Sequence, residues 1–386
     1  MPEMLSAITV DPTGQFVNVI CGDQTIKKLS IKNNGHGDLT FIGSDGPTGV
    51  GSNSIAITAP SRFAYTSNFS ANTISMFTVN SSSGVLTSIG PDVATGSGPT
   101  SAVVDPSGRF VYTTNMNANT ISMFKINQGD GTLTSTGVDI NTGVSPVAFV
   151  IDPSGRFAYA SNHVANTISM YFIDPVTGVL TSTGSDIATG VQPGTIAVDP
   201  SGRFAYVANG TSNTISVYLI DPGSGVLSGK TDLITVGGPV AVAVDPTGRF
   251  VYAANGTADT VSMYGINQST GKISYIGGLP TGTKPDSVTI DRTGNFVYIS
   301  NDTSGTVSMY SIDQTTGGLT LITSPIVSGL IPGAPFIDSS VRYTYVPNTA
   351  MNSISLFQVI PTTGALTNTG KTFSTGIAPY SIFLTK

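Results

Sequence analysis

The chain has 386 residues, of which 39% are hydrophobic and only 10% are charged, a balance opposite to that of disordered proteins. Its formal net charge of -6 argues against nucleic acid as a partner, because phosphate backbones require a positively charged surface. No apolar stretch reaches the roughly 18 residues of a membrane-spanning helix, so no membrane span is predicted.

One motif recurs along the whole chain. Each copy reads Asp-Pro-Ser/Thr-Gly-Arg-Phe, then Tyr-x-x-Asn, then Thr-Ile-Ser-Met-Tyr/Phe, and successive copies lie 46 or 47 residues apart. A fixed period of this length is typical of stacked supersecondary units. The first aromatic residues of the eight copies are Phe16, Phe63, Phe110, Phe157, Phe204, Phe250, Phe296 and Tyr343.

The unit 193–238 shows which elements one copy contains. Its predicted strands are 195–198, 204–208, 214–220 and a fourth that starts at 226. They are separated by turn sequences such as Asp-Pro-Ser-Gly, in which proline fixes φ and glycine accepts a positive φ. Four antiparallel strands in a unit of this length predict one blade of a β-propeller.

We therefore predict one all-β domain, a single closed β-propeller of four-stranded antiparallel blades. Eight blades are favoured over seven, because seven would leave about 57 residues unplaced. The end of the chain resembles a first strand and is expected to complete a blade begun at the N-terminus, which would leave residues 5–10 either displaced or frayed. The repeat units are 5–51, 52–98, 99–145, 146–192, 193–238, 239–284, 285–331 and 332–378, with a closing strand at 379–386.

The Tyr-x-x-Asn repeat with Asp-Pro-Ser-Gly-Arg-Phe resembles the YVTN-repeat, lactonase-like β-propellers, which include 6-phosphogluconolactonase-like proteins. The resemblance covers nearly the whole chain, although that family is typically described with seven blades. It implies a His, a Glu and arginines near the central channel as active residues. Here the one glutamate is Glu3, the histidines are His36 and His163, and all seven arginines lie in the repeated turn. No catalytic residue of the family is therefore carried onto this sequence.

Three residues break the repeat near the predicted mouth of the channel. His163 follows Asn162 at a position that varies among the copies, as expected of a solvated loop histidine. Lys284 and Asp286 flank the proline that opens a first strand, where other copies carry uncharged residues. The three are the candidates for general acid–base catalysis at the channel mouth. The alternative for Lys284 and Asp286 is a surface ion pair of little energetic value.

Two further rows of polar residues recur in most copies. One row of asparagines ends the second strand of seven units and is expected to tolerate left-handed backbone and to cap turns. Its members are Asn68, Asn115, Asn162, Asn209, Asn255, Asn301 and Asn348. The other row is Asp45, Asp92, Asp139, Asp186 and Asp232. Such carboxylates could collect a hard cation such as calcium, but separate blades hold them apart and no Asp-x-Asp-x-Asp-Gly loop is present, so no metal is predicted.

Charged residues suited to catalysis are scarce or belong to the repeat, so the main functional prediction is a non-catalytic scaffold that binds a protein or a surface glycan. Outer strands at 85–88 and 179–182 present edges that could add a partner strand or support self-assembly. The alternative prediction is a lactone hydrolase. No Walker, dinucleotide-binding or Cys/His motif is present, so no cofactor is predicted. Low charge favours an exported protein, although the start of the chain lacks the features of a signal peptide.

Overall fold

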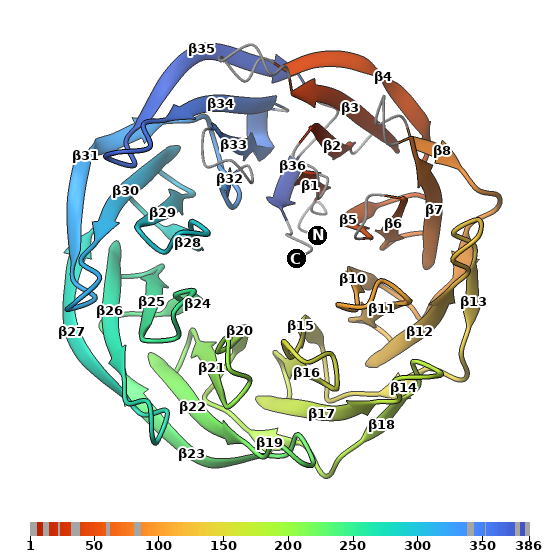
Figure 1. The fold of residues 1–386 in the computed structure, drawn as a ribbon, viewed down its shortest axis with the longest axis horizontal. Coiled ribbons are helices and arrows are strands. Elements are labelled where there is room, and N and C mark those ends of the chain that lie inside the picture. Colours follow the sequence, from red (N-terminus) through yellow and green to blue (C-terminus); the bar gives the residue numbers. More distant parts are fainter. Residues whose placement is uncertain are drawn as a thin grey trace.

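The computed structural model describes residues 6–10, 15–21, 24–31, 39–58, 62–80, 86–337, 343–351, 353–374 and 379–382. They form eight β-sheets arranged in a ring around a central axis (Figure 1). The predicted all-β propeller with eight blades is confirmed. Within the described ranges the helical content is η1 (Thr349–Met351), and no helix there is long and apolar enough to cross a membrane.

Blade 5 shows the plan of one sheet. The strands β20 (Pro193–Val198), β21 (Phe204–Asn209), β22 (Thr214–Ile220) and β23 (Leu227–Ile234) pair antiparallel in that order. The first strand lies nearest the axis and the fourth lies on the outside of the ring (Figure 1). The strands fall where the alternation of apolar and polar residues predicts them.

The other blades repeat this plan, and we number them in chain order. Blade 1 contains β1 (Ser6–Val10), β2 (Phe16–Cys21), β3 (Thr25–Ile31) and β4 (Leu39–Pro47). Blade 2 contains β5 (Ser52–Ile57), β6 (Phe63–Asn68), β7 (Thr73–Val79), β8 (Leu86–Ser88) and β9 (Val93–Ala94). Blade 3 contains β10 (Pro99–Val104), β11 (Phe110–Asn115), β12 (Thr120–Ile126), β13 (Leu133–Ser135) and β14 (Ile140–Asn141). Blade 4 contains β15 (Pro146–Ile151), β16 (Phe157–Asn162), β17 (Thr167–Ile173), β18 (Leu180–Ser182) and β19 (Ile187–Ala188). Blade 6 contains β24 (Pro239–Val244), β25 (Phe250–Asn255), β26 (Thr260–Ile266) and β27 (Ile273–Pro280). Blade 7 contains β28 (Pro285–Ile290), β29 (Phe296–Asn301), β30 (Thr306–Ile312) and β31 (Leu319–Val327). Blade 8 contains β32 (Phe336–Ile337), β33 (Tyr343–Asn348), β34 (Ser353–Val359) and β35 (Leu366–Ser374).

The two ends of the chain meet in blade 1. Its sheet has the order β36-β1-β2-β3-β4, in which β36 (Pro379–Ile382) pairs parallel with β1. The expected completion of blade 1 by the C-terminal strand is therefore found. Residues 6–10 are not displaced as expected, because β1 keeps its antiparallel pairing with β2 and β36 adds an extra inner strand. Room for the extra strand is left by blade 8, whose first strand β32 has only two residues.

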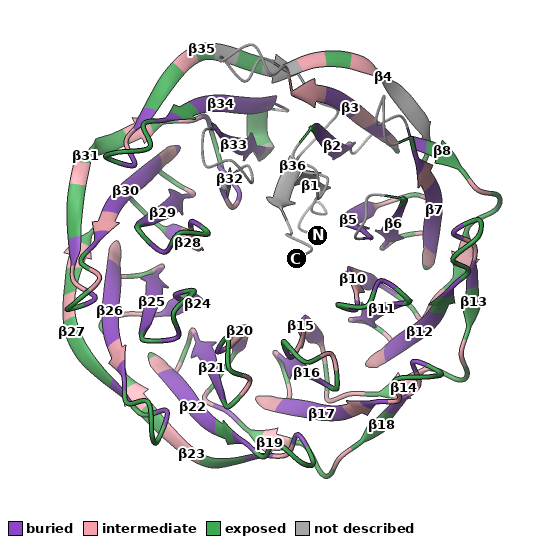
Figure 2. Cartoon of the chain, viewed as in Figure 1, coloured by how far each residue is buried: buried purple, intermediate pink, exposed green. Residues whose placement is uncertain are grey.

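The core lies between neighbouring blades. From blade 2 to blade 8, every residue of the second strands is buried (Figure 2). From blade 2 to blade 7, the tyrosine hydroxyl of the second strand donates to a glycine carbonyl in the next blade, as Tyr159 does to Gly225 at 2.9 Å. A Cβ at Gly225 would lie 2.2 Å from Cδ1 of Phe157, so the repeated Phe and Tyr of one blade require a glycine in the turn of the next.

The repeated turn explains the row of arginines. In blade 5, Asp199 Oδ1 accepts hydrogen bonds from the backbone N–H of Arg203 and of Phe204, both at 2.7 Å. The guanidinium of Arg203 lies over the Phe204 ring, with Cζ 4.9 Å from the ring centroid. In blade 3, Arg109 also donates to the Pro175 carbonyl of the next blade at 2.6 Å. These arginines therefore stabilise the turn and the blade junction.

Candidate functional site

The asparagine row forms buried networks that hold each blade together. In blade 4, Nδ2 of Asn162 donates to Thr167 Oγ1 at 3.0 Å and to Ser169 Oγ at 2.9 Å. The row residues stay in extended strands, and the positive φ expected of them is found four residues later, as at Asn166 (58°). Their role is to bridge the second and third strands, so the expectation of left-handed turn caps was wrong.

The aspartate row joins the same networks. Asp92 and Asp139 each accept weak hydrogen bonds from the row asparagine and a threonine of their own blade, at 3.3–3.4 Å. Asp186 accepts from Thr167 at 3.4 Å, and Asp232 accepts from Ser216 at 2.6 Å and pairs with Lys230 at 2.9 Å. The side chain of Asp45 lies outside the described residues, as do Glu3 and His36. Where the structure describes the chain, no three His, Cys, Asp or Glu side chains gather around a common point.

His163 lies at the inner rim of the ring, which we define as the residues that follow the asparagine row together with the starts of the first strands. Its Nδ1 lies 3.1 Å from the carbonyl oxygen of Pro193, the first residue of the next blade. A carbonyl oxygen only accepts, so Nδ1 carries the proton and donates it. In the neutral ring the lone pair is then on Nε2, which is the form a general base needs.

Lys284 precedes the first strand of blade 7 and is half of an ion pair. Its Nζ lies 2.5 Å from Oδ2 of Asp302, which occupies the same repeat position as His163. The hydrogen bond that Lys284 donates to Asp302 is the main cause that raises the pKa of Lys284, and the charge of Asp286 adds to it. The backbone N–H of Lys284 also donates to Asp259 at 2.7 Å. The ammonium is therefore held in its charged form at neutral pH.

Between His163 and Asp302 the inner rim carries glycine. Gly210 and Gly256 take the positions that follow the row asparagines of blades 5 and 6. A Cβ at Gly210 would meet only backbone oxygens, at 3.8 and 3.9 Å, so this part of the rim is open. A Cβ at Gly256 would lie 3.1 Å from Cγ1 of Val240 and 3.4 Å from the carbonyl oxygen of Pro285. The rim thus presents a stretch of backbone flanked by an imidazole and an ion pair.

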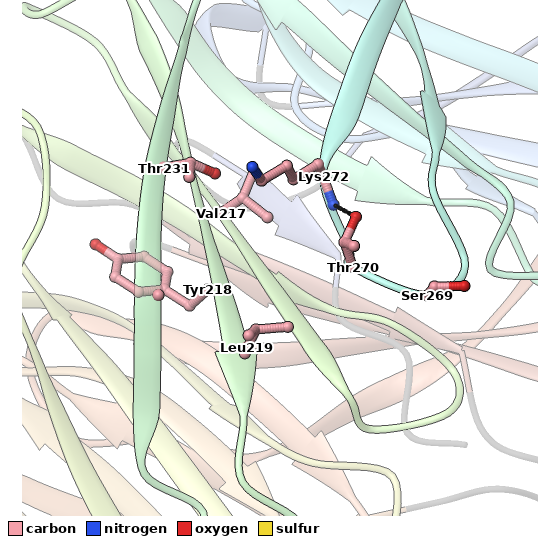
Figure 3. Close-up of a pocket in the computed structure, with 8 residues that line it drawn as sticks. Val217, Tyr218, Leu219, Thr231, Ser269, Thr270 and Lys272 are labelled. Atoms are coloured by element: carbon pink, nitrogen blue, oxygen red, sulfur yellow. Dashed lines mark hydrogen bonds between the residues drawn. The ribbon is translucent and has the colours of Figure 1, made fainter.

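A separate crevice lies in the outer wall, between blades 5 and 6 (Figure 3). Its volume is about 240 Å³, and its walls come from β22 and β23 of blade 5 and from the turn before β27 of blade 6. The lining residues are Val217, Tyr218, Leu219, Gly229, Thr231, Ser269, Thr270 and Lys272. This crevice was not among the sites expected from the sequence.

The resolved pKa shifts of carboxyl groups are all downward in the part of the chain that the structure describes. Hydrogen bonds within the turns before the fourth strands lower the pKa of Asp130, Asp174, Asp221 and Asp313. A general acid at neutral pH needs a raised carboxyl pKa, so these four groups are suited to structure rather than to proton donation.

The chain matches the model of the family described as "Lactonase, 7-bladed beta-propeller" over residues 23–150, 142–244 and 241–331. A comparison with curated proteins found no match. The seven blades in the family description differ from the eight sheets of this chain. The eighth copy of the motif, from 332, lies beyond the matched residues.

Solved structures share the fold at low sequence identity. A putative 6-phosphogluconolactonase from Bacteroides uniformis is 21% identical, with a TM-score of 0.63, over 79% of this chain and 92% of that chain. A putative 6-phosphogluconolactonase from Bacteroides fragilis is 18% identical, with a TM-score of 0.63, over 98% of this chain and 97% of that chain. A periplasmic gluconolactonase from Pseudomonas aeruginosa is 18% identical, with a TM-score of 0.58, over 73% of this chain and 86% of that chain.

Proposed function

Because the chain belongs to the lactonase family of β-propellers, we propose that it hydrolyses a lactone at the inner rim beside Lys284 and Asp286. The observation that carries the proposal is the family match over most of the chain. We place the proposed active site at the inner rim, because the titratable groups there differ from blade to blade while the rest of the motif repeats. The lactone hydrolase was the alternative prediction from the sequence, and it now takes precedence over the non-catalytic scaffold.

Lactone hydrolysis adds water to the ring carbonyl carbon and breaks the bond from that carbon to the ring oxygen. The proton lost by the attacking water finally resides on the ring oxygen, which becomes the hydroxyl of a hydroxy acid. A general base accelerates the attack, and a fixed positive charge stabilises the negative charge that develops on the carbonyl oxygen. The ammonium of Lys284 is suited to the second role, and the carboxylate of Asp286, two residues further along, to the first. His163 lies on blade 4, with blades 5 and 6 between it and Lys284, so the two do not act on one carbonyl group.

Asp302 would act on the substrate through Lys284. The hydrogen bond accepted by Asp302 keeps the ammonium charged and fixes its position on the rim. Lys284 is therefore assigned to charge stabilisation and not to proton transfer. Asp286 is the candidate base of this site.

The assay is hydrolysis of δ-gluconolactone, of its 6-phosphate and of γ-butyrolactone by the purified protein. Lys284→Met should lower kcat/KM at least tenfold, because a charge interaction specific to the transition state is lost. Asp286→Asn removes the candidate base and should lower kcat/KM by about a hundredfold, whereas His163→Asn, on a blade separated from Lys284 by two others, should leave it unchanged. Lys125→Met, which removes an exposed lysine on β12, should match the unmodified protein. Undetectable hydrolysis of all three lactones, or Lys284→Met and Asp286→Asn variants as active as the Lys125 control, would reject the proposal.

The second candidate function is the non-catalytic scaffold, and the outer strands favour it. The strands β27 and β31 have eight and nine residues, carry no charged residue, and expose Tyr275, Leu321 and Val327. Charged residues normally protect such edges from pairing with another chain. The edges predicted from the sequence are shorter, since β8 and β18 have three residues each. Light scattering tests self-assembly, a glycan array tests surface-ligand binding, and fractionation of the native cells tests the proposed export.

A further inference from the structure

A methionine in the third strand forms the outer contact between most neighbouring blades. Its sulfur accepts a hydrogen bond from the backbone N–H of the residue that opens the fourth strand of the next blade. The five pairs are Leu133 N to Met76 Sδ at 3.1 Å, Leu180 to Met123 at 3.1 Å, Leu227 to Met170 at 3.2 Å, Leu319 to Met263 at 3.0 Å and Leu366 to Met309 at 3.2 Å. Each methionine thus fills space and satisfies a buried donor.

Blades 1, 5 and 8 depart from this rule, with Lys28, Val217 and Leu356 at the methionine position, and valine is the smallest of the three. Val217 occupies the methionine position of β22, and the residue that opens the fourth strand of blade 6 is Ile273. Valine is shorter than methionine and offers no acceptor to the N–H of Ile273. The outer crevice of about 240 Å³ lies beside Val217 (Figure 3). The substitution of a small residue in one copy of the repeat therefore accounts for the crevice.

The walls of the crevice combine apolar and polar groups. Val217 and Leu219 supply an apolar wall from β22, and Leu219 is 40% exposed. Gly229 has a φ of 62°, and a Cβ there would lie 3.3 Å from Cδ1 of Leu219, so its lack of a side chain keeps the wall open. From blade 6, Lys272 extends across the crevice toward Val217 and Thr231 (Figure 3).

We propose that this crevice binds a small carboxylic acid with one apolar ring. The ring would rest on Val217 and Leu219, and the carboxylate would pair with the ammonium of Lys272. The hydroxyl of Thr270 lies at the same rim and can donate to the second carboxylate oxygen. Since an apolar cavity of about 150 Å³ holds benzene, the space is sufficient for one ring with an anionic group. The site is independent of the lactone chemistry at the inner rim.

The probe is benzoate, and benzamide serves as the neutral ligand of matched shape. Calorimetry on the full chain should give a dissociation constant for benzoate at least tenfold lower than for benzamide. Val217→Met restores the residue of the other copies, fills the crevice and should weaken benzoate binding at least tenfold. Lys272→Gln should bring benzoate to the affinity of benzamide, whereas Lys125→Gln on blade 3 should leave it unchanged.

Three results would contradict the proposed benzoate site. Failure of the unmodified protein to bind benzoate would overturn it, as would equal affinities for benzoate and benzamide. Benzoate binding by the Val217→Met protein at the original affinity would show that the ligand lies elsewhere. The Val217→Met chain keeps the packing of the other blades, so its folding can be verified by an unchanged circular dichroism spectrum.

Discussion

Three glycine-to-alanine substitutions separate backbone strain from packing between blades. Gly225 has a φ of 72°, and a Cβ there would overlap the ring of Phe157 at 2.2 Å. Left-handed backbone costs an L-residue about 1–2 kcal/mol, and an extra methyl in a packed core costs about 1–3 kcal/mol. Gly225→Ala should therefore lower the free energy of unfolding by about 2–5 kcal/mol.

The two control substitutions separate the backbone strain from the overlap with the Phe157 ring. Gly370 has a φ of 71°, but a Cβ there would have no heavy atom within 4 Å, so Gly370→Ala should cost only the backbone strain, about 1–2 kcal/mol. Gly184 has neither a positive φ nor a neighbour within 4 Å, and Gly184→Ala should stay within about 0.5 kcal/mol of the unmodified protein. Urea unfolding followed by circular dichroism gives the three values. If Gly225→Ala costs no more than Gly370→Ala, the aromatic ring of Phe157 does not require this glycine.

The remaining predictions concern tyrosines. Tyr159→Phe leaves the buried carbonyl of Gly225 without its hydroxyl donor and should cost about 1–2 kcal/mol by urea unfolding, whereas Tyr275→Phe at an exposed position should cost nothing measurable. Burial raises the pKa of Tyr310 to about 12 in the folded protein, above the value near 10 of an unfolded chain. Folding thus favours the neutral phenol, and its contribution to stability is complete below pH 10 and lost as the pH rises toward 12. A urea midpoint that is equal at pH 8 and pH 11.5 would contradict this assignment.

The repeat made most of the fold predictable. The period, the turn sequences and the alternation of apolar residues placed the strands of blade 5 within two residues of those observed. The pairing of β36 with β1 was only half anticipated, because the motif shows that a segment is a first strand but not which neighbours it will have. The short strand β32, which leaves room for it, carries a degenerate copy of the motif.

The sites were less predictable because they depend on contacts between copies. Lys284 and Asp286 stand close in sequence, yet the ion pair of Lys284 is with Asp302, which reaches it from the hairpin of the same blade. The outer crevice had a signal in the sequence, because Val217 stands where five other copies carry methionine. The motif alone does not show that the sulfur at this position accepts a backbone hydrogen bond from the following blade, as Met170 does from Leu227.

The joining of the two chain ends in one sheet has a consequence for how the protein reaches its native state. Blades 2 to 7 each form from a continuous stretch of chain, so their hairpins need only short loops to close. The contact of Ser6 with Pro379 spans nearly the whole polypeptide and must wait until the blades between them are in place. Until then the apolar sides of the first and last blades face water, so the unclosed ring is the folding intermediate most prone to self-association.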